Sequence, residues 1–274
     1  MKQLVEACKV LIFDLDGTLY EGTEHYDYYA EQIKQELPAD LQPLFVRDYE
    51  EMKLGKHALS IGKVYDMEQD AILTLDPLAH TVVEVQTWTG QTWSDGDRGA
   101  AYPGQIVYDE TRYIAVGDGW WLPYVTGAHY GAKDTYHCYN KTKDYMSSPQ
   151  FHLPKTPGLR EALAGMKGEK TLVLLTNSDG PDVRRLLRGL ELADIFDMTI
   201  TDALKPFRTA EHLQHIVHTY GVRPDEVVSI GDNFINELAP ALKLGMHAVY
   251  IAPHGGVSEY ENFLIVPTLA HAFA

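Results

Sequence analysis

Four short runs of the sequence are apolar without the alternation of polar residues that marks a half-exposed strand. They are Val10–Phe13, Thr171–Leu175, Val227–Ile230 and Ala248–Ile251. Uninterrupted apolar runs of this length are typical of strands that are buried on both faces, as in a parallel sheet. The pattern therefore predicts a parallel sheet whose first strand lies near the N-terminus and whose other strands lie in the C-terminal half.

Segments with helical patterns separate the later strands. We expect helices from Thr156-Pro157 to before Gly168, from near Asp179 through Leu190, over Thr209–Tyr220 and over Phe234–Leu244. Threonine or aspartate with a following proline marks helix starts, and glycine after the last turn marks helix ends. Strands alternating with such helices predict an α/β fold, a Rossmann-like doubly wound parallel sheet built from residues 1–20 and 154–274.

Residues 21–153 break this rhythm and predict an inserted α+β domain. The segment holds all 4 tryptophans and 13 of the 17 tyrosines. Its flanks have helical patterns, at Tyr26–Glu36, Leu41–Leu59 and Ala132–Met146. Its centre, about 80–126, is rich in Thr, Val, Tyr and Trp with turn residues between them, which favours strands. Within this centre, Ile114–Trp121 has the pattern of a hairpin whose turn is Gly117-Asp118-Gly119.

Charge excludes several classes of partner. The 274 residues include 39 acidic and 23 basic ones, which gives a net charge of −16. A negative field repels polyanions, so we expect neither a nucleic acid nor a membrane surface as a partner. Cys8 and Cys138 are too few for a disulfide framework and lack metal-ligand spacing. No run approaches 18 apolar residues, and the N-terminus runs directly into the first strand, so we expect a cytoplasmic protein.

The first strand ends in the sequence Phe13-Asp14-Leu15-Asp16-Gly17-Thr18. Two carboxylates at the carboxyl end of a buried strand face the crevice in which open α/β sheets bind ligands. An Asp-Gly pair alone would be explained by a turn. Its place directly after a buried strand favours a functional role for Asp14 and Asp16.

Asp14-Leu15-Asp16-Gly17-Thr18 resembles the first motif of the haloacid-dehalogenase-like (HAD) superfamily. Three further motifs of that superfamily have candidates in the expected order. They are Thr176-Asn177-Ser178 for the second, Lys205-Pro206 for the third and Gly231–Glu237 for the fourth. The resemblance covers roughly 1–20 and 154–253, and it implies a magnesium-dependent phosphohydrolase that cleaves a small phosphorylated metabolite.

The resemblance also implies roles for individual residues. Asp14 would be the nucleophile that forms an aspartyl-phosphate, and Asp16 the general acid and base. Thr176, Asn177 and Lys205 would bind the phosphoryl group. The Mg²⁺ ligands would be the side chains of Asp14 and Asp232 and the backbone carbonyl of Asp16. A lysine before a proline is otherwise a common solvated loop residue.

Two features depart from the superfamily pattern. The fourth motif usually carries two aspartates, whereas the second acidic position here is Glu237, and either Glu237 or Asn236 is a candidate for that role. Inserts after the first motif are usually helical caps that close over the site and select the substrate. The β-rich centre of residues 21–153 differs from that norm.

Three alternatives remain open at the level of sequence. A phosphomutase would keep all four motifs and differ only in the acceptor, while a dehalogenase would need Asp14 but neither Asp16 nor magnesium. A non-enzymatic scaffold would use the aromatic insert to bind a partner. The sequence is compatible with a monomer or a homodimer.

Other patterns have simpler explanations. His212, His215 and His218 share one face of an expected helix, but no acidic or cysteine partner lies at ligand spacing. The aromatic residues of the insert fit the core of a small domain at least as well as a stacking surface for a planar substrate.

Overall fold

The computed structural model describes residues 2–76, 79–107, 111–252, 256–258, 260–271 and 273. The chain forms two compact units, and each is described by itself below. The core unit comprises Met1–Gly22 and Leu153–Ala274, and the insert unit comprises Thr23–His152. Both ends of the insert therefore connect to one continuous α/β unit.

The core unit is built on a parallel sheet of six strands, which confirms the predicted fold class. The strand order is β10-β9-β8-β1-β6-β7. The bounds are β1 Val10–Phe13, β6 Thr171–Leu175, β7 Met198–Ile200, β8 Val227–Gly231, β9 His247–Ile251 and β10 Phe263–Val266. Strand β1 lies in the middle and pairs with both β6 and β8. The segments that follow these three strands therefore meet at one edge of the sheet.

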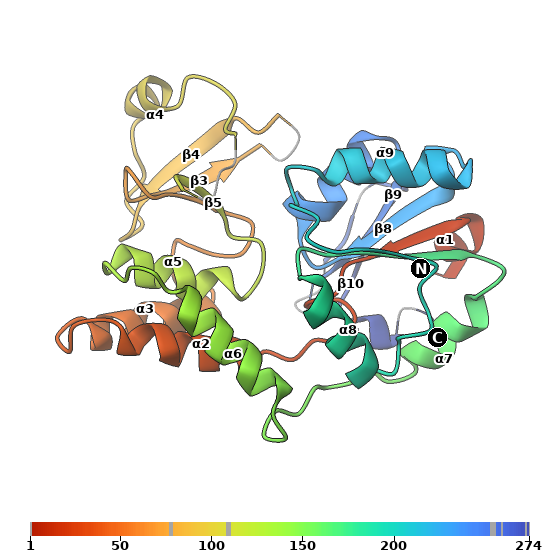
Figure 1. Ribbon diagram of the computed structural model, residues 1–274. Coiled ribbons are helices and arrows are strands. Elements are labelled where there is room, and N and C mark those ends of the chain that lie inside the picture. Colours follow the sequence, from red (N-terminus) through yellow and green to blue (C-terminus); the bar gives the residue numbers. More distant parts are fainter. Residues whose placement is uncertain are drawn as a thin grey trace. The chain divides into compact units, whose positions relative to one another are not determined.

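Helices cover both faces of this sheet. The core helices are α1 Lys2–Ala7, α7 Leu159–Met166, α8 Gly180–Gly189, α9 Thr209–Tyr220 and α10 Ala239–Lys243. Figure 1 shows α9 along one face of the sheet, with α7 and α8 on the other. On the α9 face, Val10 and Ile12 pack in one buried cluster with Leu213 and Ile216. The layers are those of a doubly wound fold.

Two predictions at helix starts are wrong. Helix α7 begins at Leu159 rather than at Thr156-Pro157, because Gly158 in the left-handed region (φ +74°) precedes it. The Thr156 hydroxyl instead donates to the carbonyl oxygen of Leu19, at 3.0 Å. The N-terminus does not run directly into β1, since helix α1 comes first.

The insert unit combines five helices with an antiparallel sheet of order β4-β3-β2-β5 among the described residues. Its strands are β2 Val64–Asp66, β3 Ala71–Leu75, β4 Val82–Thr87 and β5 Tyr113–Ala115. Its helices are α2 Glu24–Gln35, α3 Gln42–Lys53, α4 Asp95–Ala101, α5 Trp121–His129 and α6 Tyr136–Ser147. The predicted α+β composition is confirmed, but the β region extends from Val64 to Ala115 rather than over about 80–126.

The predicted hairpin over Ile114–Trp121 is wrong. Only β5 forms, and Gly117-Asp118-Gly119 leads into helix α5 instead of a second strand. The Asp118 carboxylate accepts a hydrogen bond from the backbone N–H of Trp120, at 2.8 Å, which turns the chain. Leu122, Val125 and Thr126 are then buried at helical spacing. Helical periodicity after position 121 outweighs the local β propensity of the two tryptophans.

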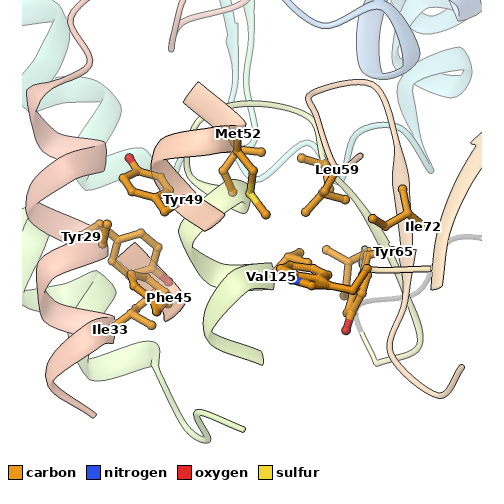
Figure 2. Packing of buried hydrophobic residues seen from close by; sticks show 14 of the residues in the cluster. Tyr29, Ile33, Phe45, Tyr49, Met52, Leu59, Tyr65, Ile72 and Val125 are labelled. Carbon is orange, nitrogen blue, oxygen red and sulfur yellow. The ribbon is translucent and has the colours of Figure 1, made fainter. Parts of the chain in front are cut away.

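Many aromatic side chains of the insert belong to its hydrophobic core. Figure 2 shows Tyr29 and Ile33 of α2 facing Phe45 and Tyr49 of α3, while Tyr65 lies on the sheet side of the same cluster. Trp88 is also buried, and its indole N–H donates to Asp48 at 2.7 Å. These aromatics hold the insert unit together, as a buried core does.

Candidate active site

Four segments that follow strands or lie near strand ends form a single cluster of polar side chains in the core unit. Asp14 directly follows β1, Thr176 follows β6 and Asp232 follows β8, while Lys205 lies in the loop between β7 and α9. The carboxyl ends of adjacent parallel strands lie at the same edge of a sheet, which is where such folds bind ligands. The topology thus brings together residues that are up to 218 positions apart.

Lys205 is the centre of this cluster. Its side chain is 2% exposed, and its Nζ lies 2.6 Å from Asp14 Oδ1 and 2.8 Å from Glu237 Oε1. The solvated-loop explanation for this lysine is therefore wrong. A buried ammonium is stable only when charged partners compensate its desolvation, and these two carboxylates do so.

Burial and charge act in opposite directions on the pKa values of this group. Burial raises the pKa of Asp14, and the charge of Lys205 opposes that rise. Burial also raises the pKa of Glu237, again against Lys205. Burial alone would lower the pKa of Lys205, but Asp14 and Glu237 together outweigh it and the pKa is raised. Lys205 therefore remains a fixed positive charge at neutral pH.

Asp16 has different partners from Asp14. Its Oδ2 accepts a hydrogen bond from the Ser178 hydroxyl at 2.8 Å, and its Oδ1 accepts one from the Tyr20 hydroxyl. The Asp16 side chain is thus tied to a neighbouring strand end and to its own turn. The two carboxylates of the first motif therefore have different partners: Asp14 contacts a charged ammonium group, and Asp16 contacts two neutral hydroxyl groups.

Asn177 holds the backbone of Lys205 with both ends of its side-chain amide. Its Nδ2 donates to the Lys205 carbonyl at 3.0 Å, and its Oδ1 accepts from the Lys205 backbone N–H at 2.7 Å. The preceding Leu204 lies in the left-handed region (φ +52°), which a leucine adopts only at a cost in free energy. The Asn177 side chain therefore fixes the lysine loop. The prediction that Asn177 binds substrate concerns its backbone N–H, which remains the candidate phosphate donor.

Thr176 is 1% exposed and lies at the start of the same loop as Ser178. Its Oγ1 accepts a hydrogen bond from the Ser178 backbone N–H at 3.1 Å. Thr176 therefore shapes the turn that presents the Ser178 hydroxyl to Asp16.

Three carboxylates converge next to Lys205. Oxygen atoms of Asp14, Asp232 and Glu237 all lie within 4.8 Å of one another. A side chain at either of two glycines would displace these carboxylates: a Cβ on Gly17 would lie 2.1 Å from Asp232 Oδ2, and one on Gly231 would lie 1.7 Å from Glu237 Oε2. The missing side chains leave room for the carboxylates to approach.

The structure distinguishes Glu237 from Asn236. The Glu237 carboxylate lies with those of Asp14 and Asp232 and contacts Lys205 Nζ at 2.8 Å. Its Oε2, like Asn236 Oδ1, is buried without a hydrogen-bond partner among the described residues. The backbone carbonyl of Asn236 accepts from the Thr209 hydroxyl at 2.6 Å. A π-helical turn over Phe234–Leu238 directs the longer glutamate side chain toward Lys205. This placement favours Glu237 as the second acidic position.

The histidine pattern of α9 does not form a metal group among the residues that the structure describes. His212 Nε2 lies 3.0 Å from the carbonyl oxygen of Ala203, and His215 faces Thr219. A different cluster, Glu36 with His137 and Cys138, does gather ligand atoms in the insert unit. Sequence spacing does not reveal it, because 101 positions separate Glu36 from His137.

The comparison with protein families agrees with this geometry. Residues 8–245 match the haloacid dehalogenase-like hydrolase family. The chain belongs to this family. It is therefore a HAD-like hydrolase, and the resemblance drawn from the four motifs is confirmed.

Solved HAD structures share the fold over nearly the whole chain. The HAD-hydrolase YfnB from Bacillus subtilis, bound to magnesium, is 12% identical with a TM-score of 0.54 and coverage of 97% of both chains. A dehalogenase solved as an intermediate complex is 18% identical, with a TM-score of 0.51 and coverage of 97% of this chain and 96% of its own. A HAD phosphatase from Thermococcus onnurineus is 16% identical, with a TM-score of 0.49 and coverage of 96% and 95%.

The TM-scores of the first two structures show a common fold and do not identify the reaction. No curated protein matches the chain at a significant level. Among the described residues, no helix is both long and apolar enough to span a bilayer.

Proposed function

We propose that this HAD-like hydrolase is a magnesium-dependent phosphatase that cleaves a small phosphomonoester through an aspartyl-phosphate on Asp14. The observation that carries the proposal is the charge of the site. Four carboxylates, those of Asp14, Asp16, Asp232 and Glu237, accompany one ammonium, that of Lys205. A site this negative repels a phosphate ester unless a cation compensates it.

The donor set fits Mg²⁺. Magnesium prefers hard oxygen ligands and commonly uses one or two protein carboxylates together with water and phosphate oxygens. Asp14, Asp232 and Glu237 offer clustered carboxylate oxygens, and Glu237 Oε2 is buried without a hydrogen-bond partner among the described residues. Asp14 and Asp232 would hold the ion together with the backbone carbonyl of Asp16, and Glu237 would bind it directly or through water. Bound there, Mg²⁺ would neutralise the repulsion between the nucleophile and the phosphate.

The first chemical step is attack by an Asp14 carboxylate oxygen on phosphorus. The new O–P bond forms as the ester P–O bond breaks, and Asp16, in its protonated form, gives its proton to the departing alkoxide. Lys205 Nζ, 2.6 Å from Asp14 Oδ1, keeps the nucleophile oriented and places positive charge beside the equatorial phosphoryl oxygens. The products of this step are the alcohol and the aspartyl-phosphate.

The second step regenerates the enzyme. Asp16, now a carboxylate, takes a proton from a water molecule whose oxygen attacks the phosphorus. The bond between phosphorus and Asp14 breaks, and inorganic phosphate leaves. Asp16 thereby recovers the proton that it lost in the first step, so the cycle is balanced.

Asp16 favours a phosphatase over a dehalogenase. Displacement of a halide by an aspartate needs no general acid, because halide leaves as a stable anion. Here both Asp16 oxygens are held by hydroxyl groups beside the nucleophile, which is consistent with acid–base work. A phosphomutase uses the same groups and differs in its acceptor, and it remains the second candidate. The insert unit, by analogy with caps, would select the substrate.

The decisive experiment measures release of p-nitrophenol from p-nitrophenyl phosphate with Mg²⁺, with a chelator, and after Mg²⁺ is restored. We expect activity only with the metal. Asp14→Asn should abolish both turnover and the covalent phospho-enzyme, whereas Asp16→Asn should lower turnover about a hundredfold or more while retaining the nucleophile. Full activity in the chelator would contradict the proposal, and chloride release from a 2-chloro acid without metal would identify a dehalogenase instead.

A further inference from the structure

Two hydroxyl groups from distant parts of the sequence hold the Asp16 carboxylate. Tyr20 belongs to the turn after β1, and Ser178 belongs to the loop after β6. Each hydroxyl donates to a different oxygen of Asp16. A hydrogen bond to a charged group is stronger than one between neutral groups, so this pair fixes the side chain firmly.

Tyr20 is rigidly placed. Its side chain is fully buried, as is that of its neighbour Leu19. Asp16 and Tyr20 also form an isolated backbone β-bridge, which sets the distance between the two side chains. A buried tyrosine hydroxyl needs a hydrogen-bond acceptor, and Asp16 supplies it.

Ser178 is placed by a separate set of contacts. Its backbone N–H donates to Thr176 Oγ1 at 3.1 Å, and its carbonyl oxygen accepts from the Asp202 backbone N–H at 3.1 Å. The serine is thereby connected to the second motif and to the segment that precedes Lys205. Movement of either segment would carry the Ser178 hydroxyl with it.

We propose that Tyr20 and Ser178 are positioning residues for the general acid and base of this enzyme, an inference that rests on the proposed function. Each hydroxyl holds a different oxygen, so rotation of the carboxylate is restricted. The group thus keeps a fixed direction for proton transfer to the leaving alkoxide and from the attacking water.

Loss of either hydroxyl should harm only the steps that transfer a proton. Nitrophenolate leaves readily without protonation, whereas an alkoxide does not. Asp16 also activates the water of the second step, which is common to all substrates, so kcat should fall for both, whereas kcat/KM reports only the steps up to release of the alcohol. For Tyr20→Phe and Ser178→Ala, we therefore expect kcat/KM for a simple alkyl phosphate to fall about tenfold and kcat/KM for p-nitrophenyl phosphate to fall less than about threefold. A purely structural defect would lower both kcat/KM values by the same factor.

A double-mutant cycle gives the sharper test. In an Asp16→Asn background, adding Tyr20→Phe or Ser178→Ala should change kcat by less than about twofold, because the residue through which they act is already lost. Tyr220→Phe removes a hydroxyl at the end of α9 and serves as the matched control, with no expected change. Thermal unfolding of each variant shows whether it folds, and Ser178→Ala tests the idea alone if Tyr20→Phe does not fold.

The outcomes separate this inference from the proposed function. Equal losses of kcat/KM on both substrates, or full additivity with Asp16→Asn, would overturn the positioning role while the phosphatase stands. Absence of metal-dependent phosphatase activity in the native chain would instead overturn the proposed function, and the inference with it.

Discussion

Glu237 is the residue at which this site departs most from its family pattern. Its carboxylate joins Asp14 and Asp232 and also contacts Lys205 at 2.8 Å. The family usually has an aspartate at the second acidic position. Glu237 has one more methylene group and reaches the same region with a longer side chain. The residue can therefore contribute to cation binding while still compensating the charge of Lys205.

Substitution of Glu237 tests that role. In Glu237→Gln, one negative charge is removed from the acidic group at nearly constant volume. We expect the Mg²⁺ concentration for half-maximal phosphatase activity to rise about tenfold or more, because hard cations prefer charged oxygen ligands. Glu261→Gln, an exposed change in the same unit, is the control. A metal-activation curve that is unchanged in Glu237→Gln would remove this residue from the metal site.

Site residues could be predicted from the sequence where they belong to motifs that follow one another in the expected order. Asp14, Asp16 and Asp232 follow from motifs at the ends of predicted strands, and Lys205 follows from the order of the motifs alone. The structure gathers the four residues in one cluster. The choice between Glu237 and Asn236 depended on a π-helical turn, which leaves no periodic signal in five residues. Tyr20 and Ser178 depended on side-chain directions that no spacing rule gives.

At the scale of elements, prediction succeeded where both ends of a segment carry a clear signal. The helix predicted over Leu41–Leu59 lacks such an end signal and stops at Lys53. Helix α9 has the predicted bounds Thr209–Tyr220, since an amphipathic pattern and Gly221 define it at both ends. Strand β7, only three residues long, gave no comparable signal. The start of α7 was misplaced because Thr156 satisfies a tertiary contact instead of capping the helix. Tertiary hydrogen bonds thus override local capping preferences.

Helices α2 and α6 are joined by an ion pair that depends on pH. His137 Nε2 lies 2.8 Å from Glu36 Oε1, and its Nδ1 lies 2.9 Å from the Asp134 carbonyl. The Glu36 carboxylate, followed by the Asp134 carbonyl, raises the pKa of His137, against smaller opposing effects of desolvation and of the charge of Lys141. Because the folded pKa exceeds the unfolded value of about 6.5, the stabilisation is complete below that value and is lost as pH rises through the folded pKa.

This sign predicts a measurable change in thermal stability. The native chain should unfold at a higher temperature than His137→Gln at about pH 5.5, and the difference should shrink by about pH 8.5 as the imidazole loses its charge. His152→Gln, an exposed histidine of the same unit, should show no such dependence. A difference that grew with pH would show that the neutral imidazole, and not the ion pair, stabilises the helix contact.

At the scale of the whole molecule, charge works against the proposed substrate. The net charge of −16 repels a phosphate ester during its approach, and salt screens that repulsion. At saturating Mg²⁺, kcat/KM for p-nitrophenyl phosphate should therefore rise about twofold or more as ionic strength increases from about 0.02 to 0.2 M. A substrate with a second phosphate should show a steeper rise. A fall in kcat/KM with salt would mean that a local positive field guides the substrate.

The central position of β1 has a consequence for how the chain is made. Val10 pairs with Thr171 on one side and with Val227 on the other, so both neighbours of the first strand are synthesised more than 150 residues later. In the sequence, the insert unit comes after β1 and before both of these neighbours. Its own strand pairs join residues within its own span. Domains generally fold as units during synthesis, and contacts between distant residues form slowly. On the ribosome, β1 therefore stays without its partner strands until after the whole insert unit has been synthesised and is able to fold.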